Sequence, residues 1–389
     1  MTRANGPLHN LGPAARWCLT AGLVSDPHPP ATLADFQNEG ELLLNEGLAP
    51  VAFQGIESQT EWQVHPMGQA FYSAAMAGHL RSMAADAAGA KVISALTNAG
   101  ISVAVIKGPS VARLHPQAWP RSYSDIDVVV SKREFSNAVS CSLNEGFEYS
   151  DRSIPQWRWF NLVCREGVNL HAHAGGNIDI HHHVPPWAFC KQFTVEHVIA
   201  NSIPANLCGI PIDIATAEDQ LLIASLHVLN DLWKGKIGLR SWRDIVAIMN
   251  SLGGDSSAQA FDSAGLGWLF ALVTEALTNA LPDVEFESSG VIDGQVPMSI
   301  RWRLEALGWS RQTSFSRHRL SWATRLPTAN ALAYLAGTAF PSPGYIRDRH
   351  GSLFNYWKAG WNETLSTRHG SDFRMTTVED KLEGEQGIN

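Results

Sequence analysis

Two aspartates separated by one apolar residue, Asp125 and Asp127 in the segment SDIDVVV, are the side chains best suited to chemistry. Successive side chains of a strand point to opposite faces, so both carboxylates lie on one face, close enough to chelate a single cation. Two negative charges at this separation repel each other unless a positive charge lies between them. Oxygen ligands suit Mg²⁺, which commonly takes substrate phosphates as its remaining ligands. The alternative interpretation of so short a motif is a strand edge that carries two solvated acids.

A turn upstream of these aspartates could receive phosphate groups. The apolar run ISVAVI is followed by Lys107, Gly108, Pro109 and Ser110. A glycine lets the backbone approach a ligand closely, and a helix N-terminus with a serine hydroxyl can bind phosphate oxygens. We therefore expect Lys107, Gly108 and Ser110 to contribute to nucleotide binding.

Two further charged residues complete this set. Arg121, four residues before Asp125, could clamp a phosphate through its guanidinium group. Asp179 lies in the apolar-flanked segment NIDIH, which predicts a neighbouring strand that adds a third carboxylate. A glycine turn, paired acids and a third acid are the minimum set for two-metal phosphoryl transfer, in which one metal positions a triphosphate and the other activates an acceptor hydroxyl. We thus predict that Asp125, Asp127 and Asp179 are the catalytic metal ligands.

Histidines near Asp179 allow a second interpretation. His171, His173 and His181 lie on the same predicted hairpin as Asp179, and histidine with carboxylate is a common zinc ligand set. A zinc-dependent hydrolase built on these four residues is therefore an alternative. We favour neutral histidines that line a polar cleft, because the spacing lacks a strong zinc signature. His181, two residues after Asp179, shares its face and is expected in the wall of the site.

Two residues of the C-terminal half have competing explanations. His227 lies in the middle of a predicted helix among leucines, where a lone histidine is more often a core residue; the resemblance described below gives a position in the site wall equal support. Asp244, in the segment WRDIVAIM, could line the site, or it could stabilise the positive N-terminal end of its own helix.

The elements that carry these side chains follow from hydrophobic spacing. The β-branched runs 101–106 and 125–130 predict buried strands, and 132–145 predicts an amphipathic helix. Between 157 and 184 the segments WFNLVCRE, VNLHAHA and IDIHHHV are typical of hairpin strands, and the chain after residue 211 is helical in pattern. This mixture predicts the α+β class, with an α/β core that contains a mixed sheet between helical regions. We expect a loosely ordered lead-in (1–34), an N-terminal helical region (35–100), the α/β core (101–210), a C-terminal helical domain (211–365) and a disordered tail (366–389).

Composition limits the classes of function. The 389-residue chain has a net charge of −8, and a general nucleic-acid binder would need a surplus of lysine and arginine. The N-terminus lacks a secretory pattern, and the longest uncharged stretch contains three prolines, so neither export nor a membrane span is predicted. Five scattered cysteines indicate free thiols in a reducing compartment, and we predict a cytoplasmic protein.

The segment ISVAVIKGPSVARLHP…RSYSDIDVVV resembles the opening of the uncharacterised nucleotidyltransferase family, within the polymerase β-like superfamily. The shared pattern is an apolar strand, Lys-Gly, small residues, an arginine and then Asp-apolar-Asp. Weaker similarities are LLLNEGLAPVAFQGI, IDIHHH, the His…Asp segment EDQLLIASLHVLNDLW with LRSWRDIVAIM, and FPSPGYIRDRHG, so the resemblance covers about 41–365. One departure is Pro109, which follows Gly108 where the superfamily has serine or a second glycine, and which has no N–H to offer a phosphate.

The resemblance implies a minimal nucleotidyltransferase fold, with Asp125, Asp127 and Asp179 as ligands and Gly108 and Ser110 in the triphosphate turn. It implies transfer of a nucleoside monophosphate from an NTP, with ATP the expected one, and two Mg²⁺ ions, with Mn²⁺ as an alternative. Because the chain is acidic, we expect the acceptor to be a hydroxyl or similar group on a small molecule or protein rather than on a nucleic acid. A non-catalytic binding protein on the same fold is a further alternative, which Pro109 makes conceivable.

Overall fold

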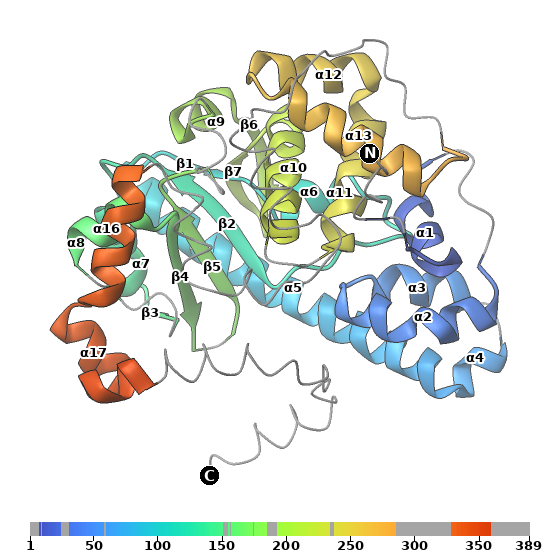
Figure 1. Ribbon diagram of the computed structural model, residues 1–389, viewed down its shortest axis with the longest axis horizontal. Helices are drawn as coiled ribbons and strands as arrows, with labels where there is room; N and C mark the ends of the chain where they lie inside the picture. The colour runs from blue at the N-terminus through green and yellow to red at the C-terminus, as the bar shows by residue number, and fades with distance from the viewer. Residues whose placement is uncertain are drawn as a thin grey trace.

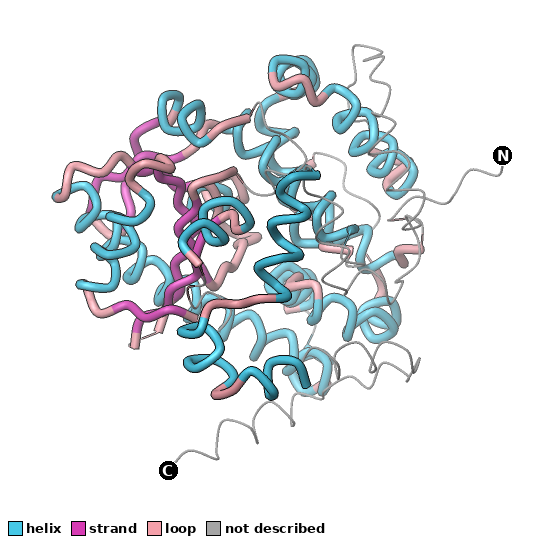
Figure 2. Tube along the Cα trace, turned by 60° about the vertical axis from the view of Figure 1, so that its left-hand side comes forward, coloured by secondary structure: helices cyan, strands magenta, loops and turns pink. Residues whose placement is uncertain are grey.

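A seven-stranded mixed sheet with helices on both faces forms the centre of the protein in the computed structural model (Figure 1). The structure describes residues 8, 10–24, 31–57, 60–150, 155, 157–173, 175–184, 193–233, 237–284 and 328–358. Figure 2 shows the strands grouped together, with helices packed around them. The strands are β1 (Val103–Val105), β2 (Asp125–Val130), β3 (Phe147–Tyr149), β4 (Gly167–Ala172), β5 (Asn177–His181), β6 (Ile203–Leu207) and β7 (Ile210–Ile214), in the order β3-β4-β5-β2-β1-β7-β6.

Helices before, between and after the strands complete the described architecture. The N-terminal group consists of α1 (Pro13–Thr20), α2 (Leu33–Asn45), α3 (Ala49–Ile56), α4 (Thr60–Val64) and α5 (Pro66–Asn98). The helices among the strands are α6 (Pro109–Ala112), α7 (Phe135–Asn144), α8 (Arg158–Cys164) and α9 (Val195–Asn201). After the sheet come α10 (Ala217–Trp233), α11 (Leu239–Leu252), α12 (Gly254–Ser263), α13 (Gly267–Ala280), α16 (Thr328–Ala339) and α17 (Pro343–His350).

Strand alternation divides β2 into an apolar face and an acidic face. Ile126, Val128 and Val130 are fully buried in a hydrophobic cluster with α5 and α7. The intervening Asp125 and Asp127 therefore project from the opposite face of the sheet. β5 repeats the pattern, because Ile178 and Ile180 join the same cluster while Asp179 lies between them. Since β2 and β5 are neighbouring parallel strands, their carboxylates share one face.

Helix α5 connects the sheet to the N-terminal helices. It is one continuous helix of 33 residues that contacts β1, β2, β5 and β7 and also α2, α3 and α4 (Figure 1). Gly78 and Gly89 lie within this helix without ending it, although glycine weakens a helix. Each glycine instead marks a close approach, since a Cβ at Gly89 would lie 2.7 Å from Ile126 Cγ1 and one at Gly78 would lie 2.8 Å from Ser122 Oγ.

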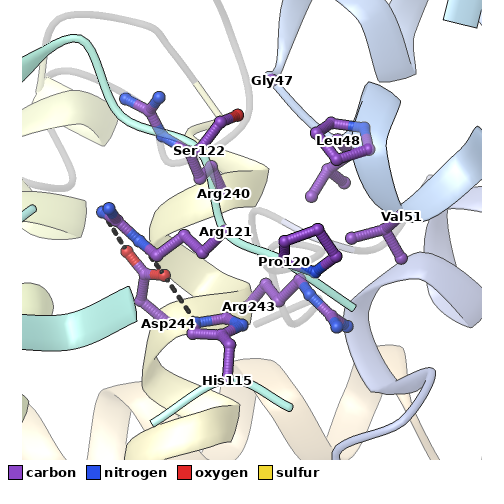
Figure 3. A pocket seen from close by; sticks show the side chains of 11 residues that line it. Gly47, Leu48, Val51, His115, Pro120, Arg121, Ser122, Arg240, Arg243 and Asp244 are labelled. Atoms are coloured by element: carbon purple, nitrogen blue, oxygen red, sulfur yellow. Dashed lines mark hydrogen bonds and ion pairs between the residues drawn. The ribbon is translucent and has the colours of Figure 1, made fainter. Parts of the chain in front are cut away.

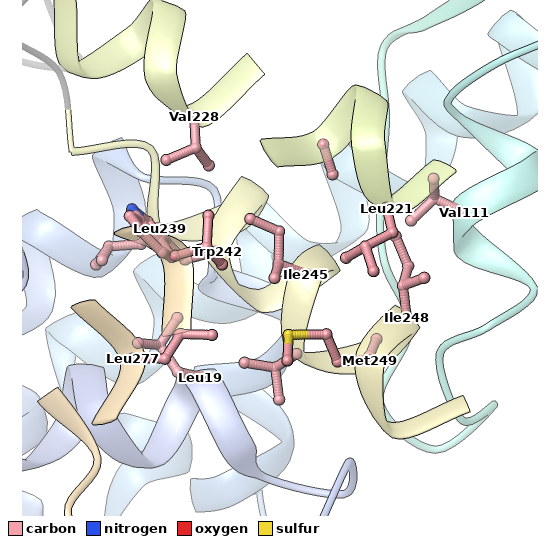
Figure 4. Packing of buried hydrophobic residues seen from close by; sticks show 14 of the residues in the cluster. Leu19, Val111, Leu221, Val228, Leu239, Trp242, Ile245, Ile248, Met249 and Leu277 are labelled. Atoms are coloured by element: carbon pink, nitrogen blue, oxygen red, sulfur yellow. The ribbon is translucent and has the colours of Figure 1, made fainter. Parts of the chain in front are cut away.

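A second hydrophobic cluster joins the N-terminal helices to α10, α11, α12 and α13, with α11 near its centre (Figure 4). Trp242, Ile245 and Ile248 of this helix are fully buried, and they pack in the cluster that contains Leu19 of α1 and Leu221 of α10. This packing holds α11 across the segment that leads into β2.

Three sequence predictions were wrong in detail. The segment WFNLVC forms helix α8 rather than a strand, because its buried residues Phe160 and Cys164 are four apart, which is helical spacing. Helix α1 lies within the predicted lead-in, where Ala14, Ala15 and Cys18 are fully buried. The chain after residue 211 was predicted to be helical, but β7 extends to Ile214 and pairs with β6 in a hairpin whose turn has positive φ at Cys208 and Gly209.

Other predictions agree with the structure. The α+β class with a mixed sheet and flanking helices is confirmed, as are the strand at 125–130 and the helix within 132–145. Residues 285–327 of the predicted C-terminal helical domain and the predicted tail at 366–389 lie outside the described residues. The division of the chain into regions at residues 34, 100, 210 and 365 stays a prediction. None of the described helices combines the length and the apolar character needed to span a bilayer.

Candidate active site

The register of β2 and β5 brings the predicted carboxylates together. Asp127 lies directly beside Asp179, and Asp125 lies beside Asn177. One ligand atom from each of Asp127, Asp179 and His181 lies within 4.8 Å of the others, and no second such group occurs within the described ranges. This cluster has the donor atoms of a divalent-cation site, with two carboxylates and one imidazole from two neighbouring strands.

Lys107 supplies a positive charge to the cluster. It follows β1, and its Nζ lies 3.5 Å from Asp127 Oδ1. Burial would by itself lower the pKa of Lys107, but the charges of Asp127, Asp125 and Asp179 outweigh it and raise that pKa. The side chain that the sequence assigned to the nucleotide is thus an ion-pair partner of a carboxylate.

The three aspartates differ in their acidity. Burial would raise the pKa of Asp127, but the Lys107 ammonium and the hydrogen bond with His181 hold it well below its usual range. Burial and the charge of Asp127 raise the pKa of Asp179 to about 7, and the same two causes raise the pKa of Asp125. The raised pKa values of Asp179 and Asp125 indicate that nearby positive groups do not offset burial and the repulsion between the carboxylates, which fits a site that binds a metal cation.

His181 and Asn169 position the two central carboxylates. His181 Nε2 lies 3.0 Å from Asp127 Oδ1, while its buried Nδ1 has no hydrogen-bond partner among the described residues. Gly167 lies opposite His181 in β4, and a Cβ there would lie 2.3 Å from Ile180 O and 2.9 Å from His181 Nδ1. Asn169, opposite Asp179 in the same strand, donates a hydrogen bond to Asp179 Oδ1. The sequence contained no signal for Asn169, because its role depends on the β4–β5 register.

The glycine turn lies against the first aspartate. Gly108 has φ +62°, and a Cβ there would lie 3.0 Å from Asp125 O, so both its conformation and its space require glycine. Ser110 is buried, and its hydroxyl accepts a hydrogen bond of 2.6 Å from Gln220 Nε2 of α10. In this structure the Ser110 side chain joins the turn to α10, and its predicted role in phosphate binding stays a prediction.

Arg121 is engaged by a carboxylate of the C-terminal half. Its Nε and Nη2 donate to the two oxygens of Asp244 at 2.6 and 2.8 Å, and His115 Nε2 lies 3.0 Å from Oδ1 (Figure 3). Burial would raise the pKa of Asp244, but Arg121 and His115 lower it far below its usual range. Asp244 therefore joins the segment before β2 to α11, a contact that the sequence did not predict.

His227 lies at the margin of the cluster. Its Nδ1 lies 3.5 Å from Lys107 Nζ, and its Nε2 lies 3.4 Å from Asp231 Oδ2 on the same helix. Lys107 therefore stands between Asp127 and His227. A third of the His227 side chain is exposed, and its place in the wall of the site stays a prediction.

The four-residue zinc cluster is not assembled. His171 Nε2 and His173 Nε2 lie 3.9 and 3.1 Å from carboxylate oxygens of Glu148 on β3, and both imidazoles are exposed. The hairpin register pairs His171 with Asn177 and leaves Asn169 opposite Asp179, so these two histidines lie further along the strand than the ligand cluster. The third member of the cluster with Asp179 and His181 is Asp127, and neither His171 nor His173 belongs to it.

Comparison with known proteins adds one finding. A family model described as uncharacterised nucleotidyltransferase matches residues 38–272, a range that contains every residue of the cluster and its surroundings. Among curated proteins, none matches the sequence.

Proposed function

The chain belongs to the uncharacterised nucleotidyltransferase family, and from this membership we propose that it transfers a nucleoside monophosphate from an NTP to an acceptor. In this reaction an acceptor oxygen attacks the α-phosphorus, the bond from that phosphorus to the bridging oxygen breaks, and pyrophosphate leaves. The acceptor hydroxyl releases its proton as the new phosphoester bond forms. We expect ATP as the donor, and a hydroxyl or similar group on a small molecule or protein as the acceptor, because a net charge of −8 disfavours a polynucleotide.

The observation that supports this proposal is the convergence of acidic ligands on one face of β2 and β5. Asp127 and Asp179 are in register, Asp125 shares their face, and the cluster has too little positive charge of its own. These residues would hold Mg²⁺ or Mn²⁺. When bound, such an ion offsets phosphate charge and lowers the pKa of an acceptor hydroxyl.

The protein groups have separable tasks in this scheme. Asp127 remains ionised because Lys107 and His181 stabilise its charge, and Asn169 orients Asp179. The Lys107 ammonium, 3.5 Å from Asp127, is close enough to the cluster to meet a phosphate that binds there. Positioning and electrostatic stabilisation supply most of the catalysis in phosphoryl transfer, so these fixed charges are the main contribution we assign to the chain.

A thermal-shift panel of the four NTPs with and without Mg²⁺ tests the proposal. A ligand at about 100 times its Kd adds about 2.7 kcal/mol to the free energy of unfolding, which is readily seen as a higher melting temperature. We expect the shift for wild type, and its loss in the double variant Asp125→Asn/Asp127→Asn. The matched control Asp213→Asn/Asp262→Asn removes two exposed carboxylates elsewhere and should respond like wild type.

Two outcomes of this panel are informative. A shift that requires both Mg²⁺ and the two aspartates supports the proposal, and pyrophosphate release with candidate acceptors then identifies the substrate. A cooperative melt with no shift for any NTP contradicts the proposal and favours a non-catalytic role. A shift followed by no pyrophosphate release with any acceptor favours nucleotide binding without transfer.

A further inference from the structure

Arg240, the second residue of α11, carries a charge that the fold leaves uncommitted. Across the described segments its guanidinium makes no hydrogen bond or ion pair, and the residue is exposed. Its side chain passes close to Gly47, where a Cβ would lie 3.5 Å from Arg240 Cδ. An arginine held at a defined position without a carboxylate partner is free to bind an anion.

Arg240 lines a pocket that is rich in guanidinium groups (Figure 3). Arg121, Arg240 and Arg243 all border it, and Asp244 is the one carboxylate among the described residues that line it. Arg243 is committed to the fold, because its Nη1 and Nη2 donate to the carbonyl oxygens of Cys18 and Ala21 at 2.7 and 2.8 Å. Among the described residues that line the pocket, three guanidinium groups therefore face one carboxylate, while the charges of Asp125 and Asp231 act on Arg240 from outside the lining.

Arg121 provides a second, independent indication of a ligand. Its side chain is 9% exposed, and Asp244 occupies its Nε and Nη2. The remaining nitrogen, Nη1, is buried without a hydrogen-bond partner in the part of the chain that the structure describes. Buried donors are almost always paired in folded proteins, so an unpaired one indicates a missing water or ligand.

The pocket adjoins the acidic cluster. Arg121 is four residues before Asp125, and the charges of Arg121 and Arg240 both act on the Asp125 carboxylate. Arg121 and Arg240 also repel each other, which an anion between them would relieve. The enclosed space is about 10 Å³, room for about one water molecule, so a larger anion would lie at the mouth beside the exposed Arg240.

We propose that Arg240, supported by Arg121, forms a phosphate subsite beside the acidic cluster. The inference rests on the proposed function, and it assigns the subsite to a phosphate group of a substrate, either on the NTP or on the acceptor. Arg240 contacts the phosphate oxygens, and the unpaired Nη1 of Arg121 donates a second contact, with Asp244 holding that guanidinium in place. The planar guanidinium group can donate two parallel hydrogen bonds to phosphate oxygens, whereas the ammonium group of a lysine acts as a point charge.

Calorimetric titration with inorganic pyrophosphate, in buffer containing EDTA, tests the subsite without metal or catalysis. We expect Arg240→Gln to weaken pyrophosphate binding at least tenfold, and Arg240→Lys to restore it in part. Arg133→Gln, which removes an exposed arginine at the far end of β2, should bind within twofold of wild type. Equal affinity of Arg240→Gln, Arg133→Gln and wild type would overturn the inference, provided that all three melt alike.

Competition with ATP distinguishes the two sources of phosphate. If the subsite holds the NTP, ATP displaces pyrophosphate and Arg240→Gln weakens ATP by the same factor as pyrophosphate. If it holds the acceptor, pyrophosphate still binds in saturating ATP and Arg240→Gln leaves ATP affinity unchanged. Either result supports a phosphate subsite. If no NTP is turned over but pyrophosphate binding still depends on Arg240, the proposed function fails and the subsite stands.

Discussion

Replacing Asp244 with asparagine perturbs the contact that ties the segment before β2 to α11. The carboxylate is 5% exposed and receives three hydrogen bonds, two from the Arg121 guanidinium and one from His115. Asparagine has nearly the same shape but no charge, so the variant leaves the buried guanidinium without a counter-charge. Removal of one partner from a buried ion pair costs about 3–5 kcal/mol.

This magnitude separates two explanations of Asp244. If the residue only stabilised the N-terminal end of α11, its neutralisation would cost about 0.3–1 kcal/mol. We therefore expect Asp244→Asn to lower the free energy of unfolding in urea by about 3 kcal/mol or more. The surface variant Asp255→Asn, in the first turn of α12, is a matched control that should change it by less than about 1 kcal/mol.

A double-mutant cycle with Arg121→Gln completes the test. If the two side chains form one unit, the double variant costs less than the sum of the single variants, by about 1–3 kcal/mol. Additive costs, or a loss below about 1 kcal/mol in Asp244→Asn, would refute the assignment of Asp244 as the anchor of this segment. Since Asp125 follows Arg121 closely, we also expect weaker Mn²⁺ binding in Asp244→Asn, measured by calorimetry.

Three further predictions concern stability and pH. Gly167→Ala should lower the free energy of unfolding in urea by about 1–3 kcal/mol, because the added Cβ would lie 2.3 Å from Ile180 O. Gly344→Ala, with open space around the added Cβ, should leave the free energy of unfolding nearly unchanged. Equal effects of the two substitutions would contradict the packing argument. The affinity for Mn²⁺ should rise as the pH increases toward about 7 and level off above it, because the Asp179 carboxyl must lose its proton to bind the ion. Calorimetry should show that the Mn²⁺ affinity of Asp179→Asn depends less on pH. The same pH profile in this variant and in wild type would exclude Asp179 as the titrating ligand. Burial lowers the pKa of His115, so the unfolded state takes up a proton below about pH 6.5 that the folded state does not, and the free energy of unfolding falls as the pH drops. In urea denaturation between pH 7 and 5.5, this fall should be smaller for His115→Gln than for wild type, by up to about 1.4 kcal/mol per pH unit. Parallel pH profiles of the two proteins would contradict this prediction.

Local pattern was enough to find the acidic ligands. The alternation of aspartate with isoleucine and valine predicts a strand with an apolar face and an acidic face, whatever lies around it. The same rule applied to NIDIH made Asp179 a candidate for the same face, and the parallel register of β2 and β5 then brought Asp127 and Asp179 together. Prediction succeeded here because side-chain direction in a strand is a property of the backbone.

Contacts between distant segments could not be predicted in this way. Lys107 and Arg121 were both expected to bind phosphate, but one pairs with Asp127 and the other with Asp244. Their partners depend on which helices pack over the sheet. The assignment of WFNLVC to a strand failed for a related reason, since a short apolar run suits either element until its packing partner is known.

The acidic motif, the α+β class and the family could be predicted without a structure, because each depends on residue types at short, regular spacing. Which charges neutralise one another could not be predicted, because it depends on the folded arrangement. That outcome depends on strand register and on how α10 and α11 pack, and these bring residues more than 100 positions apart within 4 Å, as for Lys107 with His227 and Arg121 with Asp244. Arg240 remained uncommitted by the same packing, since the carboxylate nearest in sequence, Asp244, is occupied by Arg121 and His115.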